Sequence, residues 1–196
     1  MARIKTSDTT TRKEVIINKA AHLFKDKGYK AASMRELADG VGVEAASLYN
    51  HIKGKNELLN IICFDVANKF MDNIDKIETE ALNAVEKIEK ILRFHITEMV
   101  NNFEEVYVSD REWKHLTEPY LTNFQKQRKL YRKRFAKIIE DGISKNEIKK
   151  IDASTAVLIM LHAVSGIESW HRSTQRIEGK DLEENMIAIL AGGLKK

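Results

Sequence analysis

The chain has 196 residues, of which 43% are hydrophobic and 32% are charged, and its formal net charge is +4. A chain of this length can bury a core without disulfides, and its single cysteine, Cys63, has no partner cysteine within the chain. No apolar run approaches the ~20 residues that cross a bilayer, and residues 1 to 14 lack the apolar core of a secretory signal. We therefore expect a cytoplasmic protein that does not enter a membrane.

The positive charge is concentrated in the first third of the chain. Residues 1 to 60 contain 11 Lys and Arg against 7 Asp and Glu, which accounts for the whole surplus of +4. The remaining residues contain 22 side chains of each sign. This asymmetry suggests that the N-terminal segment meets a polyanion while the rest has another role.

Helical periodicity runs through the sequence, which has one proline and nine glycines, so we predict an all-α fold with about nine helices and no strands. We expect residues 1–10 to form a basic arm and the first helix to cover residues 11–27, with Gly28 ending it. Two short helices follow around Gly42. A longer helix begins at about Lys55.

The remaining helices form a larger unit. We predict helices at residues 80–102 and 110–116, and a long one that Pro119 opens and that reaches about residue 143. The segment 153–170 is apolar on nearly every side, and Asp181 is predicted to cap a last helix that continues through Leu194. Because one subunit cannot cover all this apolar surface, the two segments predict a homodimer interface.

A helix-turn-helix is predicted between residues 33 and 52. Ser33 and Glu36 form an S-x-x-E capping box that starts a helix, and Gly42 tolerates the positive φ of a tight turn. The next helix, at about residues 44–51, buries Leu48 and leaves a small, polar and basic side exposed. Such a surface suits the major groove of DNA.

The string from Gly28-Tyr29 through "SMRELA", "VGV" and "LYNHIKGKNELL" resembles the tetracycline-repressor (TetR) family over about residues 11 to 60. The resemblance implies a DNA-binding domain at residues 1–54 and an effector-binding and dimerisation domain at residues 55–196. It also implies a palindromic double-stranded operator as partner. A small molecule bound by the second domain would change the spacing of the two DNA-reading heads.

The family resemblance assigns candidate DNA contacts residue by residue. Ser33, Tyr49, His51 and Lys55 stand at phosphate-contacting positions, and Asn50 and Lys53 face bases or flanking phosphates. Glu44 either accepts a hydrogen bond from a cytosine amino group or favours the helix N-terminus electrostatically. The complete set of DNA-binding candidates is Ser33, Met34, Arg35, Glu44, Ala45, Ser47, Tyr49, Asn50, His51, Lys53 and Lys55.

The C-terminal part looks more loosely like the branch of the family that answers to acyl-CoA thioesters, through Trp113, the basic run at residues 128–135 and Trp170. Some of these cations would hold the CoA phosphates while an acyl chain enters an apolar pocket. The alternative is that the basic run is only the solvated face of a helix. The candidate ligand-binding residues are Phe94, Met99, Trp113, Phe124, Arg128, Tyr131, Arg132 and Trp170.

We therefore expect a repressor released by a hydrophobic effector, with an efflux or detoxification regulator as the alternative. An all-helical enzyme would need a nucleophile elbow, a phosphate-binding loop or a metal motif, and the sequence contains none of these. A protein-binding adaptor would not need the capping box, turn glycine and basic head. The histidines lack metal-ligand spacing, so no metal or cofactor is expected.

Overall fold

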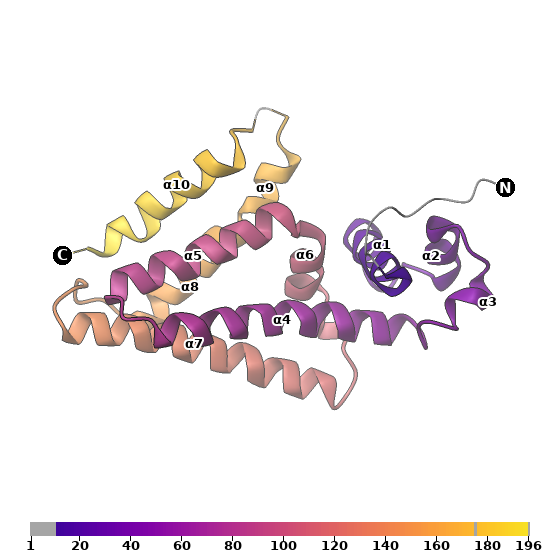
Figure 1. The fold of residues 1–196 in the computed structure, drawn as a ribbon, viewed down its shortest axis with the longest axis horizontal. Helices are drawn as coiled ribbons and strands as arrows, with labels where there is room; N and C mark the ends of the chain where they lie inside the picture. Colours follow the sequence, from indigo (N-terminus) through magenta and orange to yellow (C-terminus); the bar gives the residue numbers. More distant parts are fainter. Residues whose placement is uncertain (1–10, 175, 196) are drawn as a thin grey trace.

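The computed structural model describes residues 11–174 and 176–195. Within these ranges the chain is all-helical, and its one β-bridge joins Ile148 to Lys195 (Figure 1). The α-helices are α1 (Arg12–Lys27), α2 (Met34–Val41), α3 (Ala45–Leu48), α4 (Lys55–Thr79), α5 (Ala84–Asn101), α6 (Phe103–Arg111), α7 (Tyr120–Ser144), α8 (Ala153–Ser165), α9 (Ile167–Arg172) and α10 (Gly179–Leu190), with 3-10 turns η1 (Trp113–His115) and η2 (Gly192–Leu194). The predicted all-α class is confirmed. The basic arm predicted for residues 1–10 lies outside the described residues.

Local signals set the ends of the first helices. Thr11 caps α1: its hydroxyl oxygen accepts a hydrogen bond from the Glu14 backbone N–H. In return, the Glu14 carboxylate accepts a hydrogen bond from the Thr11 backbone N–H. Gly28 then ends α1 with φ +78°, a conformation that favours glycine. Ser33 and Glu36 form the same reciprocal cap at the start of α2. The starts of α1 and α2 and the end of α1 that the sequence predicts therefore agree with the structure to within one residue.

Two hydrophobic clusters organise the fold. The first joins α1, α2, α3 and the first half of α4, and it continues into α6 and α7 through Val108 and Phe124. The second is built on α5, whose buried Ile88 and Leu92 pack among residues of α7, α8 and α10. We call α1 to α3, with the start of α4, the head, and α5 to α10, with the rest of α4, the body. Helix α4 is the long helix that extends from the head into the body (Figure 1). The α4 residues Leu58 and Leu59 belong to the first cluster, so the core of the head crosses the predicted boundary at residues 54/55.

The helix predicted at residues 153–170 is broken into α8 and α9 at Gly166. The Gly166 N–H donates to the carbonyl oxygens of both His162 and Ala163, which tightens the last turn of α8. A Cβ atom at this position would lie 3.0 Å from the Ala163 oxygen. Periodicity alone could not reveal the break, because the apolar pattern continues past it.

Two other helix predictions were wrong. The segment 110–116 is not one helix: α6 begins at Phe103 and ends at Arg111, and only η1 follows. Asp181 is not the cap of the last helix, because Glu178 is the N-cap residue and Asp181 lies in the first turn. An acidic residue in a first turn also favours a helix electrostatically, which explains the misplacement. Helix α10 ends at Leu190, and Leu194 lies in η2.

Cys63 is buried on α4, and burial raises the pKa of its thiol to about 12. The thiol therefore stays protonated and unreactive at neutral pH. No helix among the described residues is long and apolar enough to cross a membrane.

Candidate DNA interface and internal cavity

Helices α2 and α3 form the predicted helix-turn-helix. Gly42 adopts a left-handed conformation, with φ +74° and ψ +37°, and its N–H donates to the carbonyl oxygens at the end of α2. The Val43 N–H donates to the Ala38 carbonyl oxygen at 3.0 Å, which fixes the turn. Buried Ala38 and Leu48 lie in the N-terminal cluster and hold the two helices to the head.

The second helix is shorter than predicted. Helix α3 ends at Leu48, and hydrogen-bonded turns continue it, since the N–H groups of His51 and Ile52 both donate to the Leu48 carbonyl oxygen. The Lys53 N–H then donates to the Glu57 carboxylate, which joins the turn to the start of α4. Glu44 is the N-cap residue of α3 but makes no side-chain capping bond.

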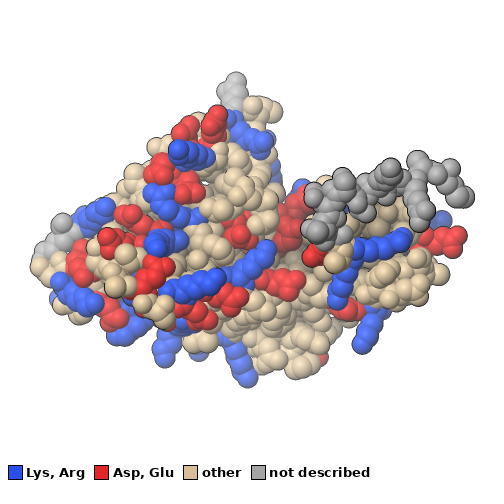
Figure 2. Space-filling view, viewed as in Figure 1, with Lys and Arg blue, Asp and Glu red and all other residues tan. Residues whose placement is uncertain are grey.

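The DNA-binding candidates lie on the surface of the head. None of them is buried, and Tyr49 is 53% exposed. Met34, Ser47 and Lys55 are half-buried, and Met34 packs against the N-terminal cluster. The exposed candidates are Ser33, Arg35, Glu44, Ala45, Tyr49, Asn50, His51 and Lys53. On the face drawn in Figure 2, basic and acidic side chains are interspersed over the body.

Lys55 has a structural role that the sequence did not indicate. Its Nζ donates to the carbonyl oxygens of Tyr29, Ala32 and Lys30 at 2.8, 2.9 and 3.2 Å and lies 4.6 Å from the centre of the Tyr29 ring. An ammonium group has three donors, so these carbonyls occupy all of them. Lys55 thereby ties the start of α4 to the loop between α1 and α2. Its predicted phosphate contact stays a prediction.

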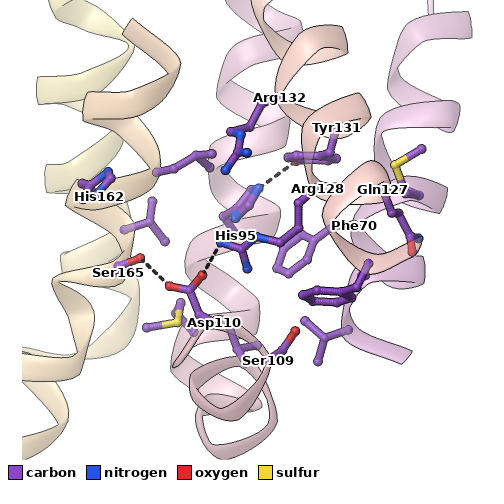
Figure 3. Close-up of a pocket in the computed structure, with 18 of the residues that line it drawn as sticks. Phe70, His95, Ser109, Asp110, Gln127, Arg128, Tyr131, Arg132, His162 and Ser165 are labelled. Atoms are coloured by element: carbon purple, nitrogen blue, oxygen red, sulfur yellow. Dashed lines mark hydrogen bonds and ion pairs between the residues drawn. The ribbon is translucent and has the colours of Figure 1, made fainter. Parts of the chain in front are cut away.

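An internal cavity of about 420 Å³ lies in the body (Figure 3). Residues of α4, α5, α6, α7 and α8 line it, and most of its lining is apolar. Arg111, Arg132, Leu158 and His162 are exposed to solvent and also line the cavity, so they mark its mouth. The His162 ring is fixed there by a 2.8 Å hydrogen bond between its Nδ1 and the Leu158 carbonyl oxygen.

Asp110 is the centre of the polar cluster in the cavity wall. Its carboxylate pairs with the Arg128 guanidinium at 2.9 Å and accepts a hydrogen bond from the Ser165 hydroxyl at 3.3 Å (Figure 3). These contacts tie α6 to α7 and to α8. The Arg128 guanidinium also lies 5.7 Å from the Trp113 ring centre and 5.8 Å from that of Phe124, which fixes its position further.

His95 forms a second polar contact in the cavity. Its Nε2 lies 2.7 Å from the Tyr131 hydroxyl, and its ring stacks on Phe70 with 4.2 Å between ring centres. Burial lowers the pKa of His95 to about 4 and raises that of Tyr131, so both are neutral at pH 7. Part of the His95 surface faces the cavity, but this enclosed surface solvates a charge poorly.

The structure places the ligand-binding candidates in two groups. Met99, Phe124, Arg128, Tyr131 and Arg132 line the cavity. The other three do not: Phe94 packs edge-on against Phe70, Trp113 packs against Phe124, and the Trp170 Nε1 donates to the Ile177 carbonyl oxygen.

Sequence reasoning missed several polar groups of the cavity wall, among them His95 on α5, Asp110 on α6 and Ser165 on α8. These residues are far apart in the sequence and follow no regular spacing, so no pattern in the sequence marks them.

Four cations on α7 make no side-chain ion pair or side-chain hydrogen bond in the described part of the chain, in contrast to Arg134, which pairs with Asp75 and Glu78. Lys129 follows Lys126 by three residues, and Arg132 and Lys133 follow Lys129 by three and four, which places all four along one side of the helix. We call this set the α7 basic stripe: Lys126, Lys129, Arg132 and Lys133. Through Arg132 the stripe reaches the mouth of the cavity.

Helix α6 contacts both the cavity and the head. Val106, Ser109 and Asp110 line the cavity. At the other side of the same helix, the Glu104 carboxylate lies 2.7 Å from His22 Nδ1 and 3.3 Å from Lys25 Nζ, both on α1. An element in contact with both sites can transmit a displacement from one to the other.

Large apolar side chains remain exposed on α8 and α10. Leu158, Ile159 and Ile189 are 55%, 58% and 72% exposed. Large exposed apolar side chains that lie next to each other, as Leu158 and Ile159 do on α8, mark an interaction surface.

Comparison with known proteins gives a consistent result. Residues 16–62 match the model of bacterial regulatory proteins of the tetR family, and residues 81–194 match that of the tetracyclin repressor-like C-terminal domain. The HTH-type transcriptional repressor KstR2 of Mycolicibacterium smegmatis is 21% identical over 96% of this chain and 93% of its own. The HTH-type transcriptional activator FasR of the same organism is 24% identical over 93% of this chain and 83% of its own.

Solved structures show the same fold. The ketosteroid transcriptional regulator KstR2 of Mycobacterium tuberculosis superimposes with a TM-score of 0.88 at 19% identity, over 96% of this chain and 97% of that one. AibR, solved in complex with isovaleryl coenzyme A and operator DNA, gives a TM-score of 0.80 at 24% identity, over 91% and 97% of the two chains.

Proposed function

Because the chain belongs to the TetR family of bacterial regulatory proteins, we propose that it is a homodimeric cytoplasmic repressor that an acyl-CoA thioester releases from a palindromic operator. Membership of the family makes the chain a DNA-binding transcription regulator and not an enzyme. The proposal adds that the protein represses transcription, that it forms a homodimer and that its effector is an acyl-CoA.

For DNA binding, we assign the surface formed by α3 and the turn after it. Tyr49 and His51 would contact phosphates, and Asn50 would read a base edge, for which its amide suits adenine. All three side chains are exposed and are held on a turn that backbone hydrogen bonds fix. Because the two heads of a dimer read equivalent half-sites, the operator would be palindromic.

For dimerisation, we assign the apolar surface of α8 and α10. A second copy would cover Ile159 and Ile189, which one subunit leaves exposed. A twofold interface brings the same patch of both subunits together, so one apolar surface suffices.

For the effector, the observation that carries the proposal is an apolar cavity whose mouth adjoins the α7 basic stripe. An acyl chain suits the cavity, and the phosphates of coenzyme A suit free cations next to its mouth. Arg128 is less suited to the phosphates, because Asp110 already pairs with it. AibR has the same fold and was solved with an acyl-CoA, isovaleryl coenzyme A, which supports the same ligand class here.

For release, we assign α6 as the connecting element. A ligand that moves Asp110 would displace α6, whose Glu104 contacts α1 of the head. The spacing of the two heads would then change. A tenfold loss of operator affinity needs only ~1.4 kcal/mol of preference for the displaced state.

Calorimetry tests the effector directly. We expect decanoyl-CoA to bind the wild type, and we expect coenzyme A alone and decanoate to bind more weakly. The double variant Lys129→Gln with Arg132→Gln should bind decanoyl-CoA more weakly, whereas Lys150→Gln, which removes an exposed cation outside α7, should not. Equal affinity of the wild type and the double variant would instead favour a regulator that responds to generic hydrophobic compounds.

A further inference from the structure

We infer that Asp110 makes the cavity select neutral acyl groups and reject free carboxylic acids. This inference rests on the proposed function, because it concerns the part of the effector that enters the cavity. Asp110 lines the cavity, and its carboxylate lies in a wall made mostly of apolar side chains.

The cations that line the cavity, other than Arg132, are already paired. Arg128 pairs with Asp110 at 2.9 Å, and Arg111 pairs with Glu168 at 2.9 Å. Of the lining residues in the described part of the chain, only Arg132 is a cation without an ion pair, and it lies at the mouth. His95 is neutral. A carboxylate that enters the cavity therefore finds no free positive charge inside.

A free acid also meets repulsion. Its carboxylate would approach Arg128 from the side of the cavity, where Asp110 already holds the guanidinium and contributes a negative charge. In an apolar cavity, a carboxylate without its own cation binds poorly, and a like charge nearby weakens binding further.

A neutral carbonyl does not meet this obstacle. A guanidinium has five N–H donors, and Asp110 takes only part of them, so Arg128 keeps donors for one carbonyl oxygen without losing its ion pair. A thioester places its carbonyl inside and its charged phosphates outside the mouth. Asp110 thus distinguishes a free acid from a thioester, because only the free acid must bury a negative charge in the cavity.

The test compares decanoate with 1-decanol, which has a chain of the same length and no charge. In Asp110→Asn, Arg128 loses its counter-ion, so decanoate should bind about tenfold more tightly or better than to the wild type, while decanol affinity stays unchanged. In the double variant Asp110→Asn with Arg128→Gln, the gain for decanoate should disappear. Asp72→Asn, on the exposed side of α4, is the matched control.

Circular dichroism establishes that each variant is folded. If Asp110→Asn does not fold, Arg128→Gln gives the reverse test: Asp110 then lacks its cation, so decanoate should bind more weakly than to the wild type and decanol equally. Unchanged decanoate affinity in the variant tested would overturn the inference. An equal gain for decanoate and decanol in Asp110→Asn would also overturn it, because cavity size rather than charge would then set the preference.

Decanoyl-CoA, measured on the same proteins, separates this inference from the proposed function. If the wild type does not bind decanoyl-CoA but Asp110→Asn gains decanoate affinity, the proposed effector is wrong and the role of Asp110 stands. If the wild type binds decanoyl-CoA and Asp110→Asn gains nothing, the proposed effector stands and the role of Asp110 is wrong.

Discussion

The Glu112 carboxylate accepts the backbone N–H of Tyr29 at 3.2 Å, although the two residues are 83 positions apart in the chain. Tyr29 belongs to the head, and its ring stacks on His115 with 5.5 Å between ring centres. Glu112 follows α6 directly and lies two residues after Asp110. The joint between head and body is therefore close in sequence to the polar cluster of the cavity.

Weakening this joint should reduce the response to effector. In Glu104→Ala combined with Glu112→Ala, α6 loses its hydrogen bonds to α1 and to Tyr29, so its displacement is transmitted less well. We expect the factor by which decanoyl-CoA lowers operator affinity to fall towards one, with decanoyl-CoA affinity itself retained. Operator titrations with and without decanoyl-CoA measure this factor. Glu140→Ala, an exposed residue of α7, is the control, and a full response in the double variant would contradict the coupling role of α6.

The DNA contacts should separate into positioning and specificity. Tyr49→Phe should weaken binding to all DNA sequences, whereas Asn50→Ala should change the preference among them. Binding measured on a panel of operator variants distinguishes the two. If both substitutions alter the preference equally, the assigned roles are wrong.

Lys55→Ala should weaken DNA binding and also destabilise the fold. The substitution leaves the carbonyl oxygens of Tyr29 and Ala32 without their charged donor, which should cost roughly 1–3 kcal/mol of the free energy of unfolding. Urea denaturation measures this cost, and Tyr49→Phe should show none of it. If Lys55 contacts phosphate as well, the salt dependence of binding should also fall by about one unit of slope. Unchanged stability would show that the three hydrogen bonds contribute nothing.

The dimer interface can be tested by charge substitution. Ile159→Glu combined with Ile189→Glu would bury charges in the proposed interface, so we expect a folded monomer with little operator affinity. Sedimentation measures the assembly. Leu130→Glu on α7 introduces the same charge at an exposed leucine outside this surface and should stay dimeric. A wild-type monomer at micromolar concentration would contradict the assignment.

Acid should destabilise the protein partly through His95. The pKa of His95 is about 4 in the folded state against an ordinary value of 6.5, so below pH 6.5 the unfolded chain binds a proton that the folded protein does not. The free energy of unfolding should therefore fall between about pH 6.5 and pH 4 and level off below, by at most about 3 kcal/mol from this group. His95→Gln should show a smaller fall when urea denaturation is repeated across this range. Identical pH profiles would show that His95 titrates normally.

Signals that act within a few residues could be recognised in the sequence. The reciprocal cap of Ser33 and Glu36 and the turn at Gly42 depend on neighbours, and the structure confirms both. The end of α8 at Gly166 could not be recognised in this way. The Gly166 N–H donates to two carbonyl oxygens of the preceding turn where α8 ends, while the apolar periodicity of the sequence continues unchanged.

The cavity could be predicted only in part. Large apolar side chains such as Met99 and Phe124 could be chosen by helical face. The pairing of Asp110 with Arg128 depends on how α6 packs against α7, and no local pattern records it. The looser family resemblance also indicates Trp113 and Trp170 as ligand contacts, but the packing of the helices places both outside the cavity lining.

An acyl-CoA and the operator should oppose each other's binding to this protein. A duplex selected from random DNA by the protein itself supplies the operator, and fluorescence anisotropy measures its affinity with and without saturating decanoyl-CoA. We expect a palindromic duplex, at least about tenfold weaker binding in the presence of decanoyl-CoA, and the same factor when decanoyl-CoA is titrated with and without the duplex. Operator affinity that does not change with bound decanoyl-CoA would contradict the proposed release.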